Sequence, residues 1–441
     1  MNFINNLLNL GRKIIPRPIF RAFQPAYHWV LAFLGAVIYG FPSRRLKVVG
    51  VTGTSGKTTT VEFLQTIFRA AGFKTASLSG LYFRILDKTE PNMLKMTMPG
   101  RFQIQKFLGK AKNAGSEYVF LEVTSEGIKQ YRHKFIKFYA AILTNLSPEH
   151  IESHKGFENY RKAKSELFKI APIHILNGDD DNFDFFYKVP VHPPKFCFAK
   201  LGRARQKIVY KMSEYPADLN LKLKGEFNKY NVLAAFAFAR LEAVDDAVSK
   251  KAIEKIESLP GRMEFIETGE NFKVLVDYAF LPQTLQKVYQ TLEVLSSRLI
   301  CVLGAAGGGR DKWKRPELAK VAEKYCREII LTNEDPYDEN PLSILEEIES
   351  GFSSNSKSQI TNSKQIPNHK SQIPNKFQIV NYKKILDRRE AIREALKSAA
   401  AGDTVVITGK GAEPWIIGPN NTKIPWDDRK VVREELEKLN L

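Results

Sequence analysis

Ten residues near the start of the chain constrain its fold more than any other segment. They span Gly50–Thr59, read Gly-Val-Thr-Gly-Thr-Ser-Gly-Lys-Thr-Thr, and begin inside the short β-branched run Leu46–Val51. Directly after them, apolar residues at helical spacing predict a helix over Thr58–Ala71. A glycine-rich turn between a strand and a helix lets backbone amides and the helix dipole face an anion. The segment therefore predicts a phosphate-binding loop in an α/β domain.

The same residues indicate which phosphates the loop would bind. Its core differs from the most common phosphate-loop spacing by one residue, because Val stands at position 51. In such loops the lysine, here Lys57, reaches the β- and γ-phosphates of a nucleotide, and the next hydroxyl, here Thr58, binds Mg²⁺. The alternative is a glycine-rich turn that only caps a helix. We expect the loop to bind ATP through Gly53, Thr54, Ser55, Gly56, Lys57, Thr58 and Thr59.

The rest of the chain alternates short apolar runs with helical patterns, which is typical of a mostly parallel sheet covered by helices. The predicted elements are the strands Tyr118–Val123, Ala140–Leu143, Lys273–Asp277, Leu299–Leu303, Glu328–Leu331 and Thr404–Thr408 and the helices Pro316–Tyr325 and Arg388–Ala400. The 441 residues are thus expected to form an α/β fold. Residues 47–259 would make a phosphate-loop ATPase domain with a mostly parallel sheet, and residues 260–441 a C-terminal Rossmann-like domain.

The formal net charge of +19 is concentrated in two segments. Residues 1–47 hold seven Lys or Arg, residues 351–378 hold four Lys, and neither segment holds an acid. Because the body of the protein carries little excess charge, we expect no nucleic-acid partner. Residues 351–378 also repeat near copies of Lys-Ser-Gln-Ile-Pro-Asn and lack residues that could fill a core. This segment is predicted to be a disordered insertion.

Residues 1–46 carry an apolar run, Trp29–Phe41, that is followed by Arg44 and Arg45. The run is thirteen residues long, whereas a membrane-spanning helix needs about 20, and no small-residue cleavage site follows it. Two interpretations remain open. Either the run forms a helix on the anionic inner face of a membrane, or it packs onto the next domain.

The three cysteines, Cys197, Cys301 and Cys326, lie far apart in the sequence and show no C-x-x-C spacing. This pattern argues against a disulfide framework and against a zinc ribbon. We therefore expect a cytoplasmic protein in a reducing environment.

Further motifs resemble those of the Mur ligase family, and most closely those of its MurE-type members, the UDP-N-acetylmuramoyl-tripeptide synthetases. The resemblance covers residues 46–435 apart from the insertion. Taken singly, each motif residue has an ordinary structural role, and it is their order and spacing that carry the resemblance. The motifs are Leu121-Glu-Val-Thr-Ser125, Thr144-Asn-Leu-Ser-Pro-Glu-His150, Tyr160-Arg-Lys-Ala-Lys-Ser-Glu-Leu-Phe168, Gly225-Glu-Phe-Asn-Lys-Tyr-Asn231, Gly261-Arg-Met-Glu264 and Val276-Asp-Tyr-Ala279.

The resemblance implies an ATP-dependent ligase of peptidoglycan precursor synthesis, which joins an amino acid to a muramoyl-peptide-type carboxylate through an acyl phosphate. It implies two Mg²⁺ ions, one at Thr58 and Glu122 and the other at His150 and a carbamylated Lys164. The implied catalytic residues are Lys57, Glu122, His150 and Lys164. Further ATP-binding residues would be Asn228, Asn231, Arg262 and Asp277, acceptor-binding residues Thr97, Thr124, Gln130 and Arg132, and amine-binding residues Asp335, Tyr337, Gly409 and Glu413. We expect a monomer.

The chain also departs from the family pattern. Tyr337 stands where an arginine grips the distal carboxylate of meso-diaminopimelate. Because tyrosine cannot form a bidentate pair with a carboxylate, this amino acid is in doubt, and a lysine-like or other amine becomes an alternative. Phe280 and Ala412 stand where the family has histidines. Only 46 residues precede the phosphate-loop strand, too few for the family's UDP-binding domain, and a lipid-linked or shortened acceptor would be one replacement.

Three other functions remain as alternatives. One is a different Mur-like ligase, such as the synthetase subunit of the lipid II amidating complex or a polyglutamate-type ligase. Another is a membrane-associated ATP-binding scaffold without catalysis, which the loss of both histidines favours slightly. A nucleic-acid-dependent ATPase is the third.

Overall fold

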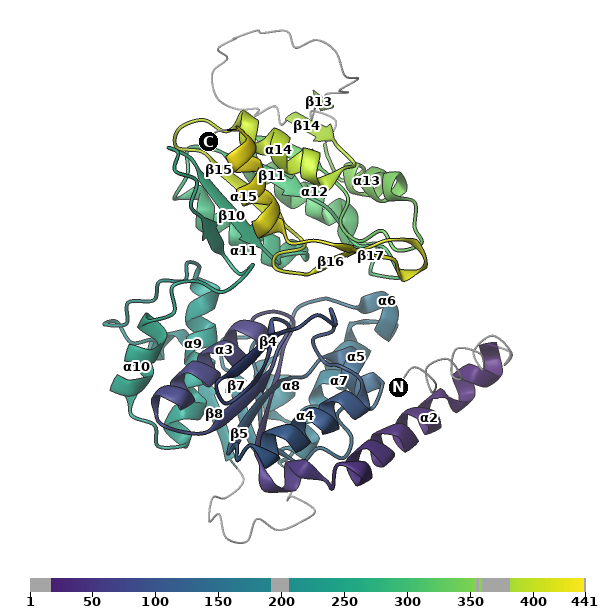
Figure 1. Ribbon diagram of the computed structural model, residues 1–441, viewed down its shortest axis with the longest axis vertical. Coiled ribbons are helices and arrows are strands. Elements are labelled where there is room, and N and C mark those ends of the chain that lie inside the picture. Colours follow the sequence, from purple (N-terminus) through teal and green to yellow (C-terminus); the bar gives the residue numbers. More distant parts are fainter. Residues whose placement is uncertain (1–16, 192–205, 354–356, 359–380, 440–441) are drawn as a thin grey trace. The chain divides into compact units, whose positions relative to one another are not determined.

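A computed structural model describes residues 17–191, 206–353, 357–358 and 381–439 (Figure 1). The chain divides into two compact units. The first comprises residues up to Leu146 together with Arg161–Tyr215 and Asn231–Ala252, and the second comprises Ser147–Tyr160, Pro216–Tyr230 and the residues from Ile253 onward. The boundary expected near residue 259 stays a prediction.

The first unit is built on a sheet whose described strands lie in the order β4-β3-β2-β5-β1-β6-β7-β8. Strands from β2 to β8 along this order are parallel, while β3 and β4 join antiparallel. The central strands are buried almost throughout, as expected for a parallel sheet with both faces covered. The strands are β1 (Lys47–Thr52), β2 (Thr75–Leu78), β3 (Tyr82–Ile85), β4 (Lys88–Pro91), β5 (Tyr118–Glu122), β6 (Phe138–Leu143), β7 (Ile173–Asn177) and β8 (Gln206–Tyr210).

Helices follow these strands along the chain, and the connection that matters most for the site runs from β1 through the glycine-rich turn into α3. The helices are α2 (Arg17–Ile38), η1 (Pro42–Arg45), α3 (Lys57–Ala70), α4 (Arg101–Asn113), α5 (Ser125–Lys129), α7 (Phe157–Ile170), α8 (Phe183–Tyr187), η2 (Met212–Glu214), α9 (Glu226–Leu241) and α10 (Asp246–Glu254). Helices α7, α9 and α10 have residues in both units.

The second unit has its own sheet, with the order β13-β14-β12-β11-β15-β10-β9 among the described strands. All pairs are parallel except β9 with β10. Apolar clusters fill both faces of this sheet. The elements are α6 (Ile151–His154), β9 (Glu264–Ile266), β10 (Lys273–Asp277), α11 (Pro282–Glu293), β11 (Leu299–Leu303), α12 (Lys314–Tyr325), β12 (Glu328–Leu331), α13 (Pro341–Glu349), β13 (Lys357–Ser358), β14 (Asn381–Lys384), α14 (Arg388–Ser398), β15 (Thr404–Thr408), β16 (Trp415–Ile417), η3 (Pro419–Asn421), β17 (Lys423–Pro425) and α15 (Asp428–Leu439).

The predicted α/β fold class is confirmed. Every strand and helix predicted from the apolar patterns is present, with ends that shift by at most two residues. Most of the segment predicted to be a disordered insertion lies outside the described residues. For two parts of it the prediction is wrong, because Phe352 packs against Tyr382 at the core of the second unit and Lys357–Ser358 pair with β14.

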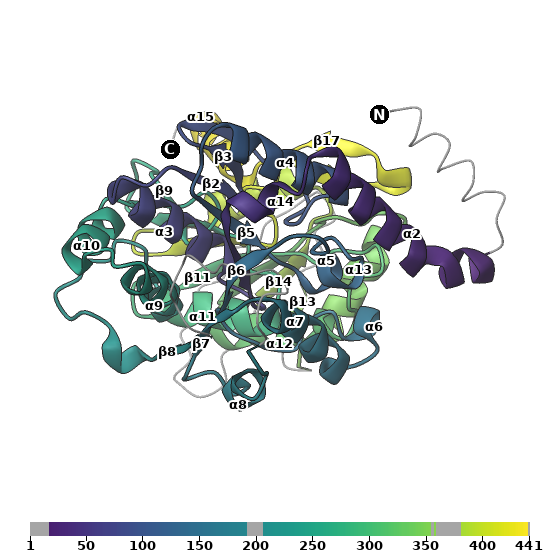
Figure 2. The same ribbon diagram turned by 90° about the horizontal axis from the view of Figure 1, so that it is seen from below.

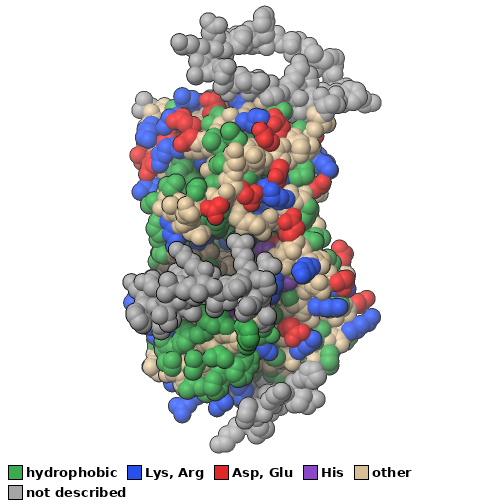
Figure 3. Space-filling view, turned by 90° about the vertical axis from the view of Figure 1, so that its right-hand side faces the viewer, with side chains coloured by type: hydrophobic (Ala, Val, Ile, Leu, Met, Phe, Trp, Pro, Cys, Tyr) green, Lys and Arg blue, Asp and Glu red, His purple; other side chains and the backbone are tan. Residues whose placement is uncertain are grey.

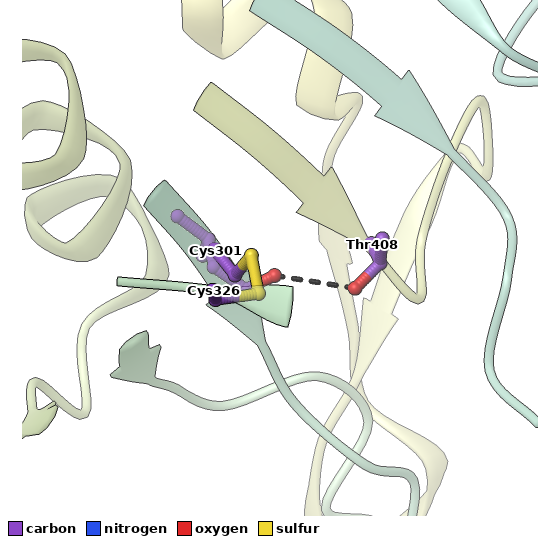
Figure 4. Close-up of a disulfide and its surroundings, with 4 residues drawn as sticks. Cys301, Cys326 and Thr408 are labelled. Atoms are coloured by element: carbon purple, nitrogen blue, oxygen red, sulfur yellow. Dashed lines mark hydrogen bonds between the residues drawn. A yellow bond between two sulfur atoms is a disulfide. The ribbon is translucent and has the colours of Figure 1, made fainter. Parts of the chain in front are cut away.

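A disulfide joins Cys301 to Cys326, with their Cα atoms 6.1 Å apart (Figure 4). The sequence-based argument against disulfides is wrong for this pair. Cys301 lies in β11 and Cys326 directly follows α12, and β12, which begins two residues later, pairs in parallel with β11. The crossover therefore brings together cysteines that are 25 residues apart in sequence. Both side chains are buried in the apolar cluster of this unit.

Candidate active site

The phosphate loop has the geometry that its glycines predict. Gly53 and Gly56 both have positive φ angles, of 155° and 78°. A Cβ atom on Gly53 would lie 1.9 Å from Thr144 Oγ1, and one on Gly56 would lie 2.2 Å from Asn231 Oδ1. Only glycine fits at these positions, so the backbone can approach a ligand as closely as a phosphate requires.

Residues after β6 support the loop from one side. The backbone amides of Thr54 and Ser55 donate to Asn145, at 2.9 Å to its carbonyl oxygen and 3.0 Å to its Oδ1. Thr144 Oγ1 donates to the Ser55 carbonyl oxygen at 2.7 Å. The Thr-Asn pair of the motif Thr144–His150 thus shapes the loop, and Thr58 and Thr59 follow it in the first turn of α3, both buried.

Two lysines meet at one loop carbonyl. Lys57 Nζ donates to the Gly53 carbonyl oxygen at 2.9 Å and to that of Thr54 at 2.8 Å. Lys164, which is 2% exposed, reaches the same Gly53 oxygen from α7 at 2.7 Å. Because both amines bond to one atom, they lie close together, and two ammonium groups at this separation would repel each other.

Three oxygen atoms gather around Gly80. Glu122 Oε1 accepts a hydrogen bond from the Gly80 amide at 2.7 Å. A Cβ atom placed on Gly80 would lie 3.3 Å from Thr58 Oγ1, 3.7 Å from Glu122 Oε1 and 3.8 Å from Thr97 Oγ1. Carboxylate and hydroxyl oxygens are the ligands that Mg²⁺ prefers, so Thr58 and Glu122 fit the ion predicted for them. The described residues contain no cluster of three or more His, Cys, Asp and Glu that could hold a metal.

The remaining predicted metal ligand, His150, belongs to the second unit, whereas Lys164 belongs to the first. His150 precedes α6, and its Nε2 atom lies 3.4 Å from Glu149 Oε1. Asp311 holds this turn, because its carboxylate accepts the amides of Ile151 and Glu152 at 3.0 and 3.1 Å. The sequence could not reveal this support, since 160 residues separate Ile151 from Asp311.

The other predicted ATP-binding residues fall into two groups. Asn231 lies beside Gly56 in the first unit, whereas Asn228, Arg262 and Asp277 belong to the second. Asp277 accepts the amides of Met263 and Ala279, each at 2.7 Å, and burial raises the pKa of its carboxyl group. The Arg262 guanidinium stacks on the Tyr278 ring at 4.3 Å, and Asn228 donates to the Lys224 carbonyl oxygen at 2.8 Å.

Two of the four predicted acceptor-binding residues contact each other. Arg132 donates to Gln130 Oε1 at 2.7 Å and also to the Met98 carbonyl oxygen, next to Thr97. The Thr124 hydroxyl accepts the Gly127 amide at 3.0 Å and so caps α5. A residue without a predicted role, Arg101, donates to the Gln130 carbonyl oxygen. Burial, followed by the nearby Arg132 charge, lowers the pKa of Arg101 to about 10.

This pair of guanidinium groups is suited to bind an anion. Each has a buried Nε without a hydrogen-bond partner in the described residues, and the one acid whose charge acts on the pair is Glu126, near Arg132. We expect Arg101→Gln to raise the KM for an anionic acceptor by about tenfold or more, because a hydrogen bond to a charged group contributes about 1.5–3 kcal/mol. The KM for ATP should not change. Steady-state kinetics compares this variant with Lys106→Gln, which removes an exposed charge from the same helix, and equal KM values in both variants would contradict the assignment.

Two of the predicted amine-binding residues, Asp335 and Glu413, bind a buried lysine of the second unit. Lys410 Nζ bonds to Asp335 Oδ1 at 2.9 Å, to Glu413 Oε2 at 2.7 Å and to the Trp415 carbonyl oxygen at 2.6 Å. Tyr278 donates to the other oxygen of Glu413 at 2.9 Å. Tyr337 has a φ of 53° and packs its ring against Gly308. Lys410 therefore organises Asp335 and Glu413, a role that sequence reasoning missed.

Glu334 is a second buried group that the sequence did not single out. Its Oε2 has no hydrogen-bond partner in the described residues and would lie 2.4 Å from a Cβ atom on Gly409. Burial raises the pKa of this carboxyl group, as does the neighbouring Asp335. Gly409, with a φ of 103°, therefore leaves room for a carboxyl group that can accept a hydrogen bond from an amine.

Comparisons with known proteins decide the family. The model of the Mur ligase middle domain matches residues 51–239, and that of the Mur ligase glutamate ligase domain matches residues 261–411. The chain belongs to the Mur ligase family. A relative from Syntrophomonas wolfei, named UDP-N-acetylmuramoyl-L-alanyl-D-glutamate–2,6-diaminopimelate ligase, is 34% identical over 92% of this chain and 81% of its own length. A UDP-N-acetylmuramyl-tripeptide synthetase from Roseiflexus is 32% identical over 96% of this chain and 85% of its own.

Solved structures agree with this Mur ligase assignment. A structure of a UDP-N-acetylmuramoyl-L-alanyl-D-glutamate–2,6-diaminopimelate ligase shares 27% identity and a TM-score of 0.54 over 90% of this chain and 79% of its own. Mycobacterium tuberculosis folylpolyglutamate synthase, complexed with ADP and AMPPCP, has a TM-score of 0.63 over 86% of this chain and 92% of its own. Its 14% identity supports the fold alone. The protein is an ATP-dependent Mur ligase that acts in peptidoglycan precursor synthesis.

Proposed function

We propose that this Mur ligase adds one amino acid to the carboxylate of a muramoyl-peptide acceptor in the cytoplasm. The observation that carries the proposal is the convergence of the phosphate loop, Glu122 and Lys164 in one unit, which also holds the basic pair Arg101 and Arg132. The loop suits the nucleotide, and the basic pair suits an acceptor that carries negative charge. We further propose that the protein acts as a monomer.

The chemistry activates a carboxylate, which is a poor acylating group. An acceptor carboxylate oxygen attacks the γ-phosphorus of ATP, ADP leaves, and an acyl phosphate forms. The amine of the amino acid then attacks the acyl carbon, releases phosphate and loses a proton. Because the reacting groups are all anionic in the first step, positive charge and positioning dominate the catalysis. Lys57 supplies the protein's own charge at the phosphates.

The proposed metal ions complete this charge arrangement. Thr58 and Glu122 would hold one Mg²⁺, and His150 with a carbamylated Lys164 would hold the other. Bound Mg²⁺ supplies the positive charge that two approaching anions need. Carbamylation of Lys164 converts an ammonium group into an anion that can bind a metal, and it removes the repulsion between Lys164 and Lys57 at the Gly53 carbonyl oxygen.

Isotope transfer tests the acyl phosphate. An acceptor labelled with ¹⁸O in its terminal carboxylate is incubated with ATP and the amino acid. We expect ADP and phosphate carrying one ¹⁸O atom, because the oxygen that attacks the γ-phosphorus stays with the phosphate when the amine displaces it. AMP carrying one ¹⁸O atom together with unlabelled pyrophosphate, as an acyl adenylate would give, or unlabelled phosphate, would reject this route.

The identity of the amino acid depends on Tyr337. Burial raises the pKa of this phenol, so the side chain remains neutral. It can donate a single hydrogen bond, whereas an arginine would form a bidentate ion pair with a carboxylate. We propose an amino acid without a distal carboxylate, such as lysine or ornithine, although several relatives are named for 2,6-diaminopimelate.

A substitution that restores the cation tests this selectivity. We expect Tyr337→Arg to raise kcat/KM for meso-diaminopimelate relative to lysine by about tenfold or more, because a bidentate ion pair is stronger than a neutral hydrogen bond. Tyr337→Phe serves as the control and should leave the ratio low. A wild-type enzyme that already prefers meso-diaminopimelate would exclude the proposed amine class.

A further inference from the structure

Helix α2 uses one side to pack against the first unit. Ala32 and Ala36 are fully buried on that side, and a Cβ atom on Gly35 would lie 3.6 Å from Phe102 of α4. Small residues therefore bring α2 close to α4, and the two helices run side by side (Figures 1 and 2). Packing against the first unit therefore explains the apolar residues on only this side of α2.

The opposite side of α2 is apolar and exposed. A surface helix ordinarily presents polar and charged residues to water, but residues 23–43 contain no Asp, Glu, Lys or Arg. Large apolar side chains on this side are 38–69% exposed. They form the α2 outer face, which consists of Phe23, Trp29, Val30, Phe33, Leu34, Val37 and Ile38.

Aromatic rings extend this face into one surface. Trp29 stacks on Phe33 with ring centroids 5.5 Å apart, and Phe135, from the turn before β6, packs edge-on against both. Figure 3 shows hydrophobic side chains gathered into a continuous patch on this side of the molecule. Contiguous apolar patches of this kind mark interaction sites.

Basic residues lie on the segments next to the α2 outer face, and these segments hold no acid, although Glu90 of β4 lies near Lys110. Arg44 and Arg45 are exposed directly after the helix, and Lys106 and Lys110 are exposed on α4. The chain has no acid before Glu62, none over residues 91–116, which include α4, and none over residues 127–148, which include Phe135. This rim is complementary to an anionic surface.

We propose that the α2 outer face docks on a lipid bilayer that carries anionic headgroups. No helix in the described residues is long and apolar enough to cross a membrane, and the arrangement instead matches a helix that lies in the interface with its apolar side among the acyl chains. A second copy of the chain fits less well, because a twofold contact would place one basic rim against another.

The docking places the acceptor residues near the lipid. Tyr27 of α2 interacts electrostatically with Arg101, which contacts Gln130 and neighbours Arg132. The acceptor side of the ligase would then face the bilayer surface, where a substrate with a lipid carrier is available. The docking itself does not depend on the proposed reaction and is measured without substrates.

Vesicle sedimentation of the full chain tests the proposal. We expect binding to vesicles of equimolar phosphatidylcholine and phosphatidylglycerol, weaker binding to phosphatidylcholine alone, and loss of the difference at high salt. The double variant Leu34→Glu with Val37→Glu should lower the partition coefficient by about tenfold or more, because it places charge among acyl chains. The matched control is Val294→Glu with Leu342→Glu, which alters residues that are 83% and 52% exposed in the second unit and should bind like wild type.

Three outcomes would overturn the proposal. Equal binding by wild type and the α2 double variant, with ATP turnover showing that both are folded, would exclude the α2 outer face. A dimer in the absence of vesicles that the double variant converts to monomers would identify a second copy as the occupant. Binding that appears only after residues 1–16 are deleted would identify that segment as the occupant.

Discussion

Lys57→Ala is expected to lower acceptor-dependent ADP formation by about 10³-fold or more, because it removes a positive charge aimed at the developing charge on the γ-phosphate. Among the described residues, the hydrogen bonds of the Lys57 Nζ atom go to two loop carbonyl oxygens, those of Gly53 and Thr54. Lys57 can replace these two carbonyl oxygens with phosphate oxygens as hydrogen-bond acceptors without a movement of α3. Folding should be unaffected, since the amine supports no other element.

The measurement is a coupled assay of ADP release with saturating acceptor and amino acid. Lys169→Ala is the control, because this lysine pairs with Glu166 on the exposed side of α7 and should keep full activity. A Lys57→Ala enzyme that retained more than a tenth of wild-type activity would mean that the glycine-rich turn is not the phosphate-binding loop.

Lys164→Ala should abolish ligation, and a second variant decides why. If Lys164 acts as an ammonium group that holds the Gly53 carbonyl oxygen, Lys164→Arg preserves the charge and the hydrogen bond and should retain activity. If Lys164 is carbamylated, arginine cannot replace it and both variants should be inactive while still binding ATP. We expect the second result, because an ammonium beside Lys57 in a buried site is unfavourable.

Direct detection of the carbamate accompanies the kinetics. Wild-type protein equilibrated with ¹³C-bicarbonate should show a carbamate resonance that is absent from Lys164→Ala, and activity should rise with bicarbonate. Lys162→Ala, an exposed lysine of the same helix, should leave both properties unchanged. Wild-type activity in Lys164→Ala would remove this residue from the mechanism.

The sequence predicted the features that local patterns encode. The period of apolar residues located the strands and helices of both sheets, and the order Gly53, Gly56 and Lys57 predicted a loop that the structure places between β1 and α3. Glu122 could be placed at a strand end because it follows a buried apolar run. Its proximity to Thr58 and Thr97 then follows from the parallel order of β1 and β5.

Features that depend on tertiary contact could not be predicted. The disulfide joins cysteines separated by a whole helix, and Asp311 supports a turn 160 residues earlier in the chain. In the sequence Arg101 looks like an ordinary helix residue, and only the structure shows its contact with Gln130 and its position beside Arg132. For α2, the packing interpretation is confirmed for one side, which lies against α4, whereas the membrane interpretation of the exposed side stays a prediction.

Product masses test the central claim most directly. Purified protein is mixed with ATP, Mg²⁺ and UDP-muramoyl-L-alanyl-D-glutamate, and with lysine, ornithine or meso-diaminopimelate in separate reactions. We predict a product that contains one residue of lysine or ornithine, formed with ADP and absent from Lys57→Ala reactions. Bound ATP without a product from any of the three amines would contradict the account and favour a different acceptor or an ATP-binding protein without ligase activity.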